Sequence, residues 1–128
     1  MKSILIVENN ESVAKMFAYL FAGHAWRVTW YTDAQRAGEA LAGQVHYDAV
    51  LVGHRFEGIN GVDLITRIRA FDHRKDVPIV MMTGNVDVAV VAAALAAGAD
   101  GVLKKPADVA ILVATVTKCV ERRRHQAV

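Results

Sequence analysis

The segment Tyr47-Asp48-Ala49-Val50-Leu51-Val52-Gly53 decides the fold class of this chain. Its four consecutive apolar residues are typical of a strand that is buried on both faces of a sheet. Gly58, Asn60 and Gly61 follow soon afterwards, and these residue types favour the backbone angles that tight turns require. The stretch therefore predicts a central strand of a parallel sheet that ends in a loop.

Short apolar runs of the same kind alternate with helical patterns along the whole chain. The predicted strands are Lys2–Val7, Arg27–Tyr31, Ala49–Val52, Ile79–Met82 and Gly101–Leu103. The predicted helices, in which apolar residues recur at helical spacing, are Ser12–Ala22, Ala34–Ala42, Val62–Ala70, Val86–Ala97 and Val109–Arg123. Asp33 and Asp108 occupy N-cap positions, and Gly23, Gly43 and Gly98 fall where helices end.

Five strands that alternate with five helices predict an α/β fold: a five-stranded parallel sheet, doubly wound and flavodoxin-like, in a three-layer α/β/α sandwich. In open sheets of this type, ligands bind beyond the carboxyl ends of the strands. The residues expected to meet at that edge are Glu8, Asn9, Gly53, Thr83 and Lys105.

The composition limits the classes of protein that the chain can belong to. Its 128 residues suit one domain, 1–128, and the 54% hydrophobic fraction excludes a disordered chain. We find no apolar run long enough to span a membrane and no signal peptide, and the single cysteine, Cys119, fits a cytoplasmic protein. The net charge of +2 is too small to predict nucleic-acid binding by the domain. Residues 121–128 form a basic C-terminal tail or the start of a linker.

Four strand ends carry a recognisable set of residues. They are Ile4-Leu5-Ile6-Val7-Glu8-Asn9-Asn10, the segment ending at Gly53, Ile79-Val80-Met81-Met82-Thr83-Gly84, and Gly98-Ala99-Asp100-Gly101-Val102-Leu103-Lys104-Lys105-Pro106. In order and spacing they resemble the receiver domain of two-component response regulators, and the resemblance covers nearly the whole chain. The resemblance implies a magnesium ion held by two acids after the first strand and a phosphoryl group accepted by an aspartate after the third. It also implies a hydroxyl residue after the fourth strand and a lysine before a proline after the fifth.

The chain keeps part of this pocket and departs from the rest. Glu8 matches the first acid, Thr83 the hydroxyl residue, and Lys105-Pro106 the lysine and proline. Asn9 replaces the second acid, and Gly53 replaces the phosphoacceptor. Glu57 replaces a proline of the acceptor loop, and Val102 replaces the aromatic residue that changes rotamer on activation.

These departures predict a degenerate phosphorylation pocket. Glycine has no side-chain nucleophile for phosphoryl transfer, and magnesium prefers anionic oxygen ligands. We therefore expect no aspartyl phosphate, no catalytic residue, no metal site and no cofactor, with magnesium binding weak or absent. His54 is expected to point to the opposite face as a half-exposed loop residue, Glu57 to pair with Arg55 or face water, and Asp48 to lie too far from the strand end.

The retained pocket residues have simpler interpretations as well. Thr83 at a strand end is suited to capping the next helix, and Lys105 before a proline is suited to a solvated loop. A third interpretation is that Lys105 pairs with Glu8.

The predicted helix Val86–Ala97 has almost no polar face. A helix that is apolar all round is expected to be covered by another surface. By resemblance, the fourth helix, fifth strand and fifth helix form the face with which receivers dimerise or contact outputs, here represented by Val86, Val90, Ala93, Ala97 and Ile111. The alternative is that alanine-rich faces are simply good helix formers.

The sequence thus predicts an atypical receiver, or pseudo-receiver, that acts by protein–protein contact, as a homodimer or with a partner. A C-terminal output domain in a longer chain is one such partner. The alternative is a regulatory domain that binds a small anion or metabolite in the emptied pocket beside Thr83 and Lys105. Other doubly wound enzymes are disfavoured, because the chain has no glycine-rich phosphate loop after its first strand.

Overall fold

The computed structural model of the chain describes residues 1–105 and 108–126, with Val109 and Gln126 described by backbone only. Five parallel strands form one sheet in the order β2-β1-β3-β6-β7. Their bounds are β1 Ser3–Val7, β2 Arg27–Tyr31, β3 Ala49–Gly53, β6 Ile79–Thr83 and β7 Gly101–Lys104. The helices are α1 Glu11–Gly23, α2 Ala34–Ala42, α3 Gly61–Ala70, α4 Val88–Ala97 and α5 Val109–Gln126.

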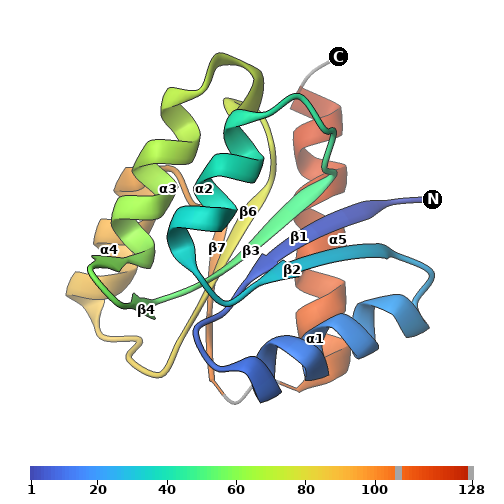
Figure 1. The fold of residues 1–128 in the computed structure, drawn as a ribbon, viewed down its shortest axis with the longest axis horizontal. Helices are drawn as coiled ribbons and strands as arrows, with labels where there is room; N and C mark the ends of the chain where they lie inside the picture. Colours follow the sequence, from blue (N-terminus) through green and yellow to red (C-terminus); the bar gives the residue numbers. More distant parts are fainter. Residues whose placement is uncertain (106–107, 127–128) are drawn as a thin grey trace.

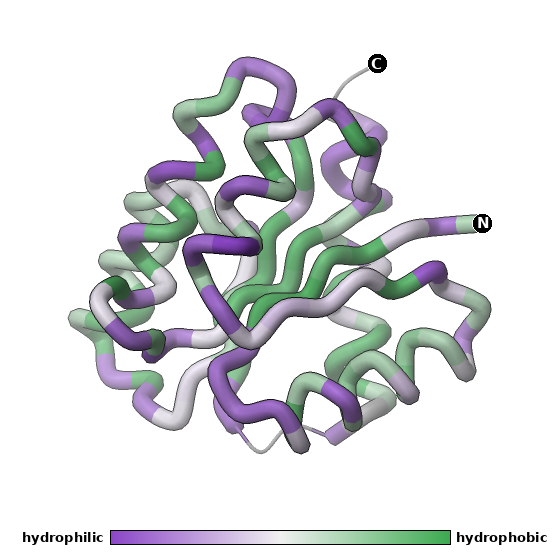
Figure 2. Tube along the Cα trace, in the orientation of Figure 1, coloured by the Kyte–Doolittle hydropathy of each residue, from purple (hydrophilic) through white to green (hydrophobic). Residues whose placement is uncertain are grey.

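The helices cover both faces of this sheet, as the sequence predicts (Figure 1). Helices α2, α3 and α4 lie on one face, and α1 and α5 lie on the other. Successive strand residues alternate between the two cores: Leu5 and Val50 pack toward the first, whereas Ile4 and Leu51 pack toward the second. The central strands are hydrophobic along their length because both of their faces are covered (Figure 2). The predicted doubly wound α/β/α sandwich is confirmed.

The predicted boundaries are correct to within one to three residues, and the differences have local causes. Helix α4 starts at Val88 rather than Val86, because the Asp87 carboxylate accepts a hydrogen bond from the Val90 N–H and caps the helix. Helix α5 continues to Gln126, so the basic residues predicted as a tail or linker are helical as far as the structure describes them.

Two short elements were not predicted. A two-stranded antiparallel hairpin, β4 Arg55–Phe56 and β5 Ile59–Asn60, follows β3, and a 3-10 turn, η1 Asp72–Arg74, follows α3. Among the described residues, no helix is long and apolar enough to cross a membrane.

At the end of the sheet opposite the candidate site, the half-buried Asp100 carboxylate joins several elements. One Asp100 oxygen accepts hydrogen bonds from Arg69 at 3.1 Å and from the Ile79 N–H at 2.8 Å, and the other accepts from Arg123 at 2.7 Å. This group ties α3, β6 and α5 to the segment between α4 and β7. Arg123 is therefore a structural residue of α5 rather than part of a solvated tail.

Substitution of Asp100 by Ala should lower the free energy of unfolding by about 3 kcal/mol, because it leaves two partly buried arginines without their carboxylate. Urea unfolding measures this difference. The control is Asp72→Ala, which removes an exposed pair with Lys75 and should leave stability unchanged. Equal effects of the two substitutions would contradict the structural role of Asp100.

Candidate functional site

The candidate site lies at the carboxyl ends of the parallel strands, where the sequence places it. The structure brings together there Glu8 and Asn9 after β1, His54 and Arg55 after β3, Thr83, Gly84 and Asn85 at the end of β6, and Lys105 after β7. They line a cavity of about 350 Å³. Pro106, which the sequence pairs with Lys105, lies outside the described residues.

The most tightly held group in the site is an ion pair between Glu8 and Lys105. The Lys105 Nζ donates to both Glu8 carboxylate oxygens, at 2.5 and 2.7 Å. Glu8 is only 4% exposed, so its charge is compensated by this lysine rather than by water. The sequence left two interpretations open for Lys105, a solvated loop residue or a partner of Glu8, and the structure shows the pair with Glu8.

Gly53 is the residue that leaves room for this ion pair. Gly53 lies beside Glu8 because β1 and β3 are neighbours and pair Val7 with Val52. A Cβ atom built on Gly53 would lie 2.5 Å from Glu8 Oε2, far inside van der Waals contact. The Glu8 carboxylate therefore occupies the space where a side chain at position 53 would begin.

His54 lies elsewhere than the sequence predicts. Its Nδ1 is 2.8 Å from the Thr83 Oγ1, so the ring lines the site instead of pointing to the opposite face. The strand alternation behind the prediction ends at Gly53, because the chain turns there into the β4-β5 hairpin. Burial lowers the pKa of His54 below its ordinary value, and the charges of Arg55 and Lys105 lower it further, while Asp87 opposes them.

Thr83 is buried and its hydroxyl has three partners. Besides His54, the Thr83 Oγ1 accepts a hydrogen bond from the Asn85 N–H at 3.0 Å and donates to the Asn85 carbonyl at 3.2 Å. The hydroxyl thus holds Asn85 in the loop that leads to α4, but the prediction that Thr83 caps this helix is wrong, because its N-cap is Asp87. The sequence singled out neither His54 nor Asn85 as a partner of Thr83.

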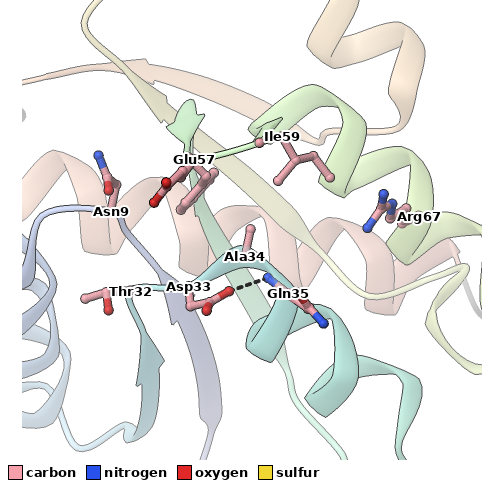
Figure 3. A pocket seen from close by; sticks show the side chains of 10 residues that line it. Asn9, Thr32, Asp33, Ala34, Gln35, Glu57, Ile59 and Arg67 are labelled. Atoms are coloured by element: carbon pink, nitrogen blue, oxygen red, sulfur yellow. Dashed lines mark hydrogen bonds between the residues drawn. The ribbon is translucent and has the colours of Figure 1, made fainter.

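Asn9 and Glu57 border a neighbouring cleft of about 540 Å³, between the start of α2 and the β4-β5 hairpin. Figure 3 shows their side chains in this cleft together with Thr32 and Asp33. Asp33 caps α2 through the N–H groups of Gln35 and Arg36. Glu57 therefore borders the cleft and does not line the cavity around Lys105.

The carboxylates of the site do not gather into a cluster. Within residues 1–105 and 108–126, no group of three or more His, Cys, Asp or Glu side chains could hold a metal ion. The side-chain oxygens of the residues that line the cavity belong to the paired Glu8 carboxylate, the Thr83 hydroxyl and the neutral amides of Asn9 and Asn85.

The residues predicted for an interface are exposed to different extents. Val86 is 40% and Ile111 57% exposed, and Ala93 is also exposed. Val90 and Ala97 are half-buried, because they pack against the core below α4. Val102 of β7 is half-buried against the same core. Val88 and Leu95, which belong to the same apolar helix but were not among the residues chosen for the interface, are 86% and 49% exposed.

The family model of the response regulator receiver domain matches residues 4–117. The chain belongs to the response regulator receiver domain family. The DNA-binding response regulator MtrA of Mycolicibacterium smegmatis is 31% identical over 96% of this chain and 52% of its own length. The sensory transduction protein RegX3 of Mycobacterium tuberculosis is 31% identical over 95% and 52%, so the chain spans about half the length of these relatives.

Solved receiver structures share this fold. A CheY-like receiver domain from Methanospirillum hungatei superposes with a TM-score of 0.91 at 17% identity, covering 98% of both chains. The receiver domain of the sensor histidine kinase PA1611 of Pseudomonas aeruginosa has a TM-score of 0.85 at 28% identity, covering 94% of this chain and 98% of its own. In that relative, a magnesium ion is coordinated in the active-site cleft.

Substitution of Gly53 by Ala should lower the free energy of unfolding by about 1–3 kcal/mol, because the added methyl group must displace the Glu8 carboxylate. The same substitution in a Glu8→Ala background should cost much less, since the obstructing group is gone. A double-mutant cycle by urea unfolding measures this coupling. Equal costs in both backgrounds would show that Glu8 does not fill this space.

His54 should make the domain less stable in mild acid. Its folded-state pKa lies below the ordinary 6.5, so the unfolded chain binds the proton more readily. The stability gained from neutral His54 is complete above pH 6.5 and is lost as the pH falls toward the folded-state pKa. Urea unfolding from about pH 7.5 to about pH 5 should show a steeper loss for the wild type than for His54→Gln. Parallel profiles would contradict the shift.

Proposed function

We propose that this chain is a pseudo-receiver: a signalling module of the two-component type that is not phosphorylated in the usual way and acts by constitutive protein–protein contact. The single observation that carries the proposal is the Glu8 carboxylate beside Gly53, bound on both oxygens by Lys105. Position 53 offers no nucleophile, and the lysine that the family uses for the phosphoryl group is already neutralised. We propose no catalytic role for any residue.

The donor set also supports weak or absent binding of magnesium. This ion requires near-octahedral coordination by hard, preferably anionic oxygen. Glu8 is the one carboxylate that lines the cavity within the described residues, and an ion there would compete with Lys105 for both of its oxygens. Asn9 adds a neutral amide. The residues present therefore fit magnesium poorly.

The surface of α4, β7 and α5 is the proposed contact face. Helix α4 carries no charged residue from Val88 to Ala97, and Val88, Leu95 and Ile111 expose large apolar side chains. Exposed apolar side chains on a surface helix that carries no charge favour association with another protein surface. We propose a second copy of this chain as the partner.

The curated relatives support one further part of the proposal. MtrA is a DNA-binding response regulator about twice as long as the segment that this chain matches. We propose that an output domain in a longer chain, or a separate protein, receives the signal from the contact face. The domain itself is not proposed to bind nucleic acid.

Incubation with acetyl phosphate and magnesium should leave the mass of the intact protein unchanged. Beryllofluoride with magnesium should leave its amide spectrum unchanged, because no carboxylate at position 53 can form the adduct. Intact-mass spectrometry and NMR measure these outcomes, with a receiver that keeps the aspartate as the positive control. A stoichiometric phosphoryl or beryllofluoride adduct on this chain would overturn the proposal.

Val88→Glu and Leu95→Glu should each weaken self-association at least about tenfold, because a charge must then be buried in an apolar contact. Analytical ultracentrifugation over a range of concentrations measures the dissociation constant. Tyr19→Glu is the matched control, since Tyr19 is also large and 80% exposed but lies on α1. A wild type that stays monomeric throughout would refute the homodimer.

A further inference from the structure

Lys105 is bound to the strand ends of the sheet through both its backbone and its side chain. Its backbone N–H donates to the Thr83 carbonyl at 2.8 Å, and its side chain reaches the Glu8 carboxylate. Glu8 is itself held to β2, because its N–H donates to the Tyr31 carbonyl at 3.0 Å. Lys105, directly after β7, is thus bound to the end of β6 through its backbone and to Glu8, after β1, through its side chain.

The Glu8 carboxylate that binds Lys105 also lies next to Gly53. Oε2 lies 2.5 Å from the Cβ position of residue 53 and 2.7 Å from the Lys105 Nζ. A side chain at position 53 would therefore begin in the volume that the Glu8 carboxylate occupies, next to the lysine that this carboxylate binds. Glu8 therefore supplies from β1 a negative charge in the space beside the end of β3.

The neighbouring loop is closed in a comparable way. The three partners of the Thr83 hydroxyl, His54 and both backbone groups of Asn85, all belong to the chain. This hydrogen bonding holds the segment from the end of β6 to Asp87, the residue that caps α4. The Lys105 Nζ and the Thr83 hydroxyl thus both have hydrogen-bond partners that belong to the chain itself.

We infer that Glu8 is a positioning residue that permanently replaces the carboxylate of position 53. By holding Lys105, it keeps the end of β7, and with it the contact face, in a single conformation without a phosphoryl group. This inference rests on the proposed function and adds its regulation: the signal is set by the presence of the partner rather than by a change in the pocket.

The test moves the carboxylate from one strand to the other. Three variants are compared with the wild type: Glu8→Ala, Glu8→Ala with Gly53→Asp, and Glu8→Ala with Gly53→Asn. Hydrogen exchange of the amides of residues 101–105 and 108–112 is followed by NMR. Ultracentrifugation gives the dissociation constant of the homodimer for the same samples. No phosphodonor is added.

Glu8→Ala should speed exchange in these residues about tenfold, because local opening becomes easier when Lys105 loses its partner. Gly53→Asp should restore slow exchange in that background, and the uncharged Gly53→Asn should not. Unchanged exchange in Glu8→Ala, or equal restoration by Asp and Asn, would overturn the inference.

Two features keep this test decisive. If Glu8→Ala does not fold, Glu8→Gln is used, because it keeps the shape of the side chain and removes its charge. Hydrogen exchange of the same amides is then expected to become faster, and unchanged exchange in Glu8→Gln would overturn the inference. The outcome is also separate from the proposed function. An adduct with acetyl phosphate or beryllofluoride on the wild type would refute the pseudo-receiver. The exchange measurement tests only whether the Glu8 charge holds Lys105 and the end of β7 in place.

Discussion

The site depends on the burial of one charge at the carboxyl edge of the sheet. Glu8 directly follows β1, the strand between β2 and β3 in the sheet, and it is almost completely removed from water. A carboxylate in such a place requires a cation within hydrogen-bonding distance, and Lys105 is that cation. The absence of a side chain at Gly53 makes the arrangement sterically feasible. These three residues come from three strand ends and form one unit.

A second charge, the half-buried Asp100 at the opposite ends of the strands, has a different role. Asp100 is bound by two arginines and a backbone N–H, so its partners come from three other elements. Asp100, which lies between α4 and β7, thus links α3, β6 and α5. Ion pairs with little exposure to water therefore lie at both ends of the strands, and α4 carries no charged residue from Val88 to Ala97.

The fold could be predicted from the sequence because its signals are local. Apolar runs, helical spacing and capping residues such as Asp33 lie within a few positions of the elements that they define. The members of the site could be predicted as well, since the ends of parallel strands meet at one edge. Gly53 was informative for the same reason: its neighbours specify the strand, and its own lack of a side chain limits the chemistry.

The contacts inside the site could not be predicted, because they depend on side-chain geometry between distant residues. Glu8 and Lys105 are 97 positions apart, and the sequence left their pairing as one of several interpretations. His54 was misplaced because strand alternation was extended one residue beyond the end of β3, into an unpredicted hairpin. The half-buried state of Val90 and Ala97 likewise depends on how α4 is rotated against the core.

The close approach of Glu8 to Gly53 also has an evolutionary consequence. A mutation that introduces aspartate at this position meets a carboxylate that already occupies the space and the cation. Two negative groups would then share one lysine, and their repulsion would destabilise the domain. During evolution, substitutions at positions 8 and 53 are therefore coupled, because either one changes the stability cost of the other.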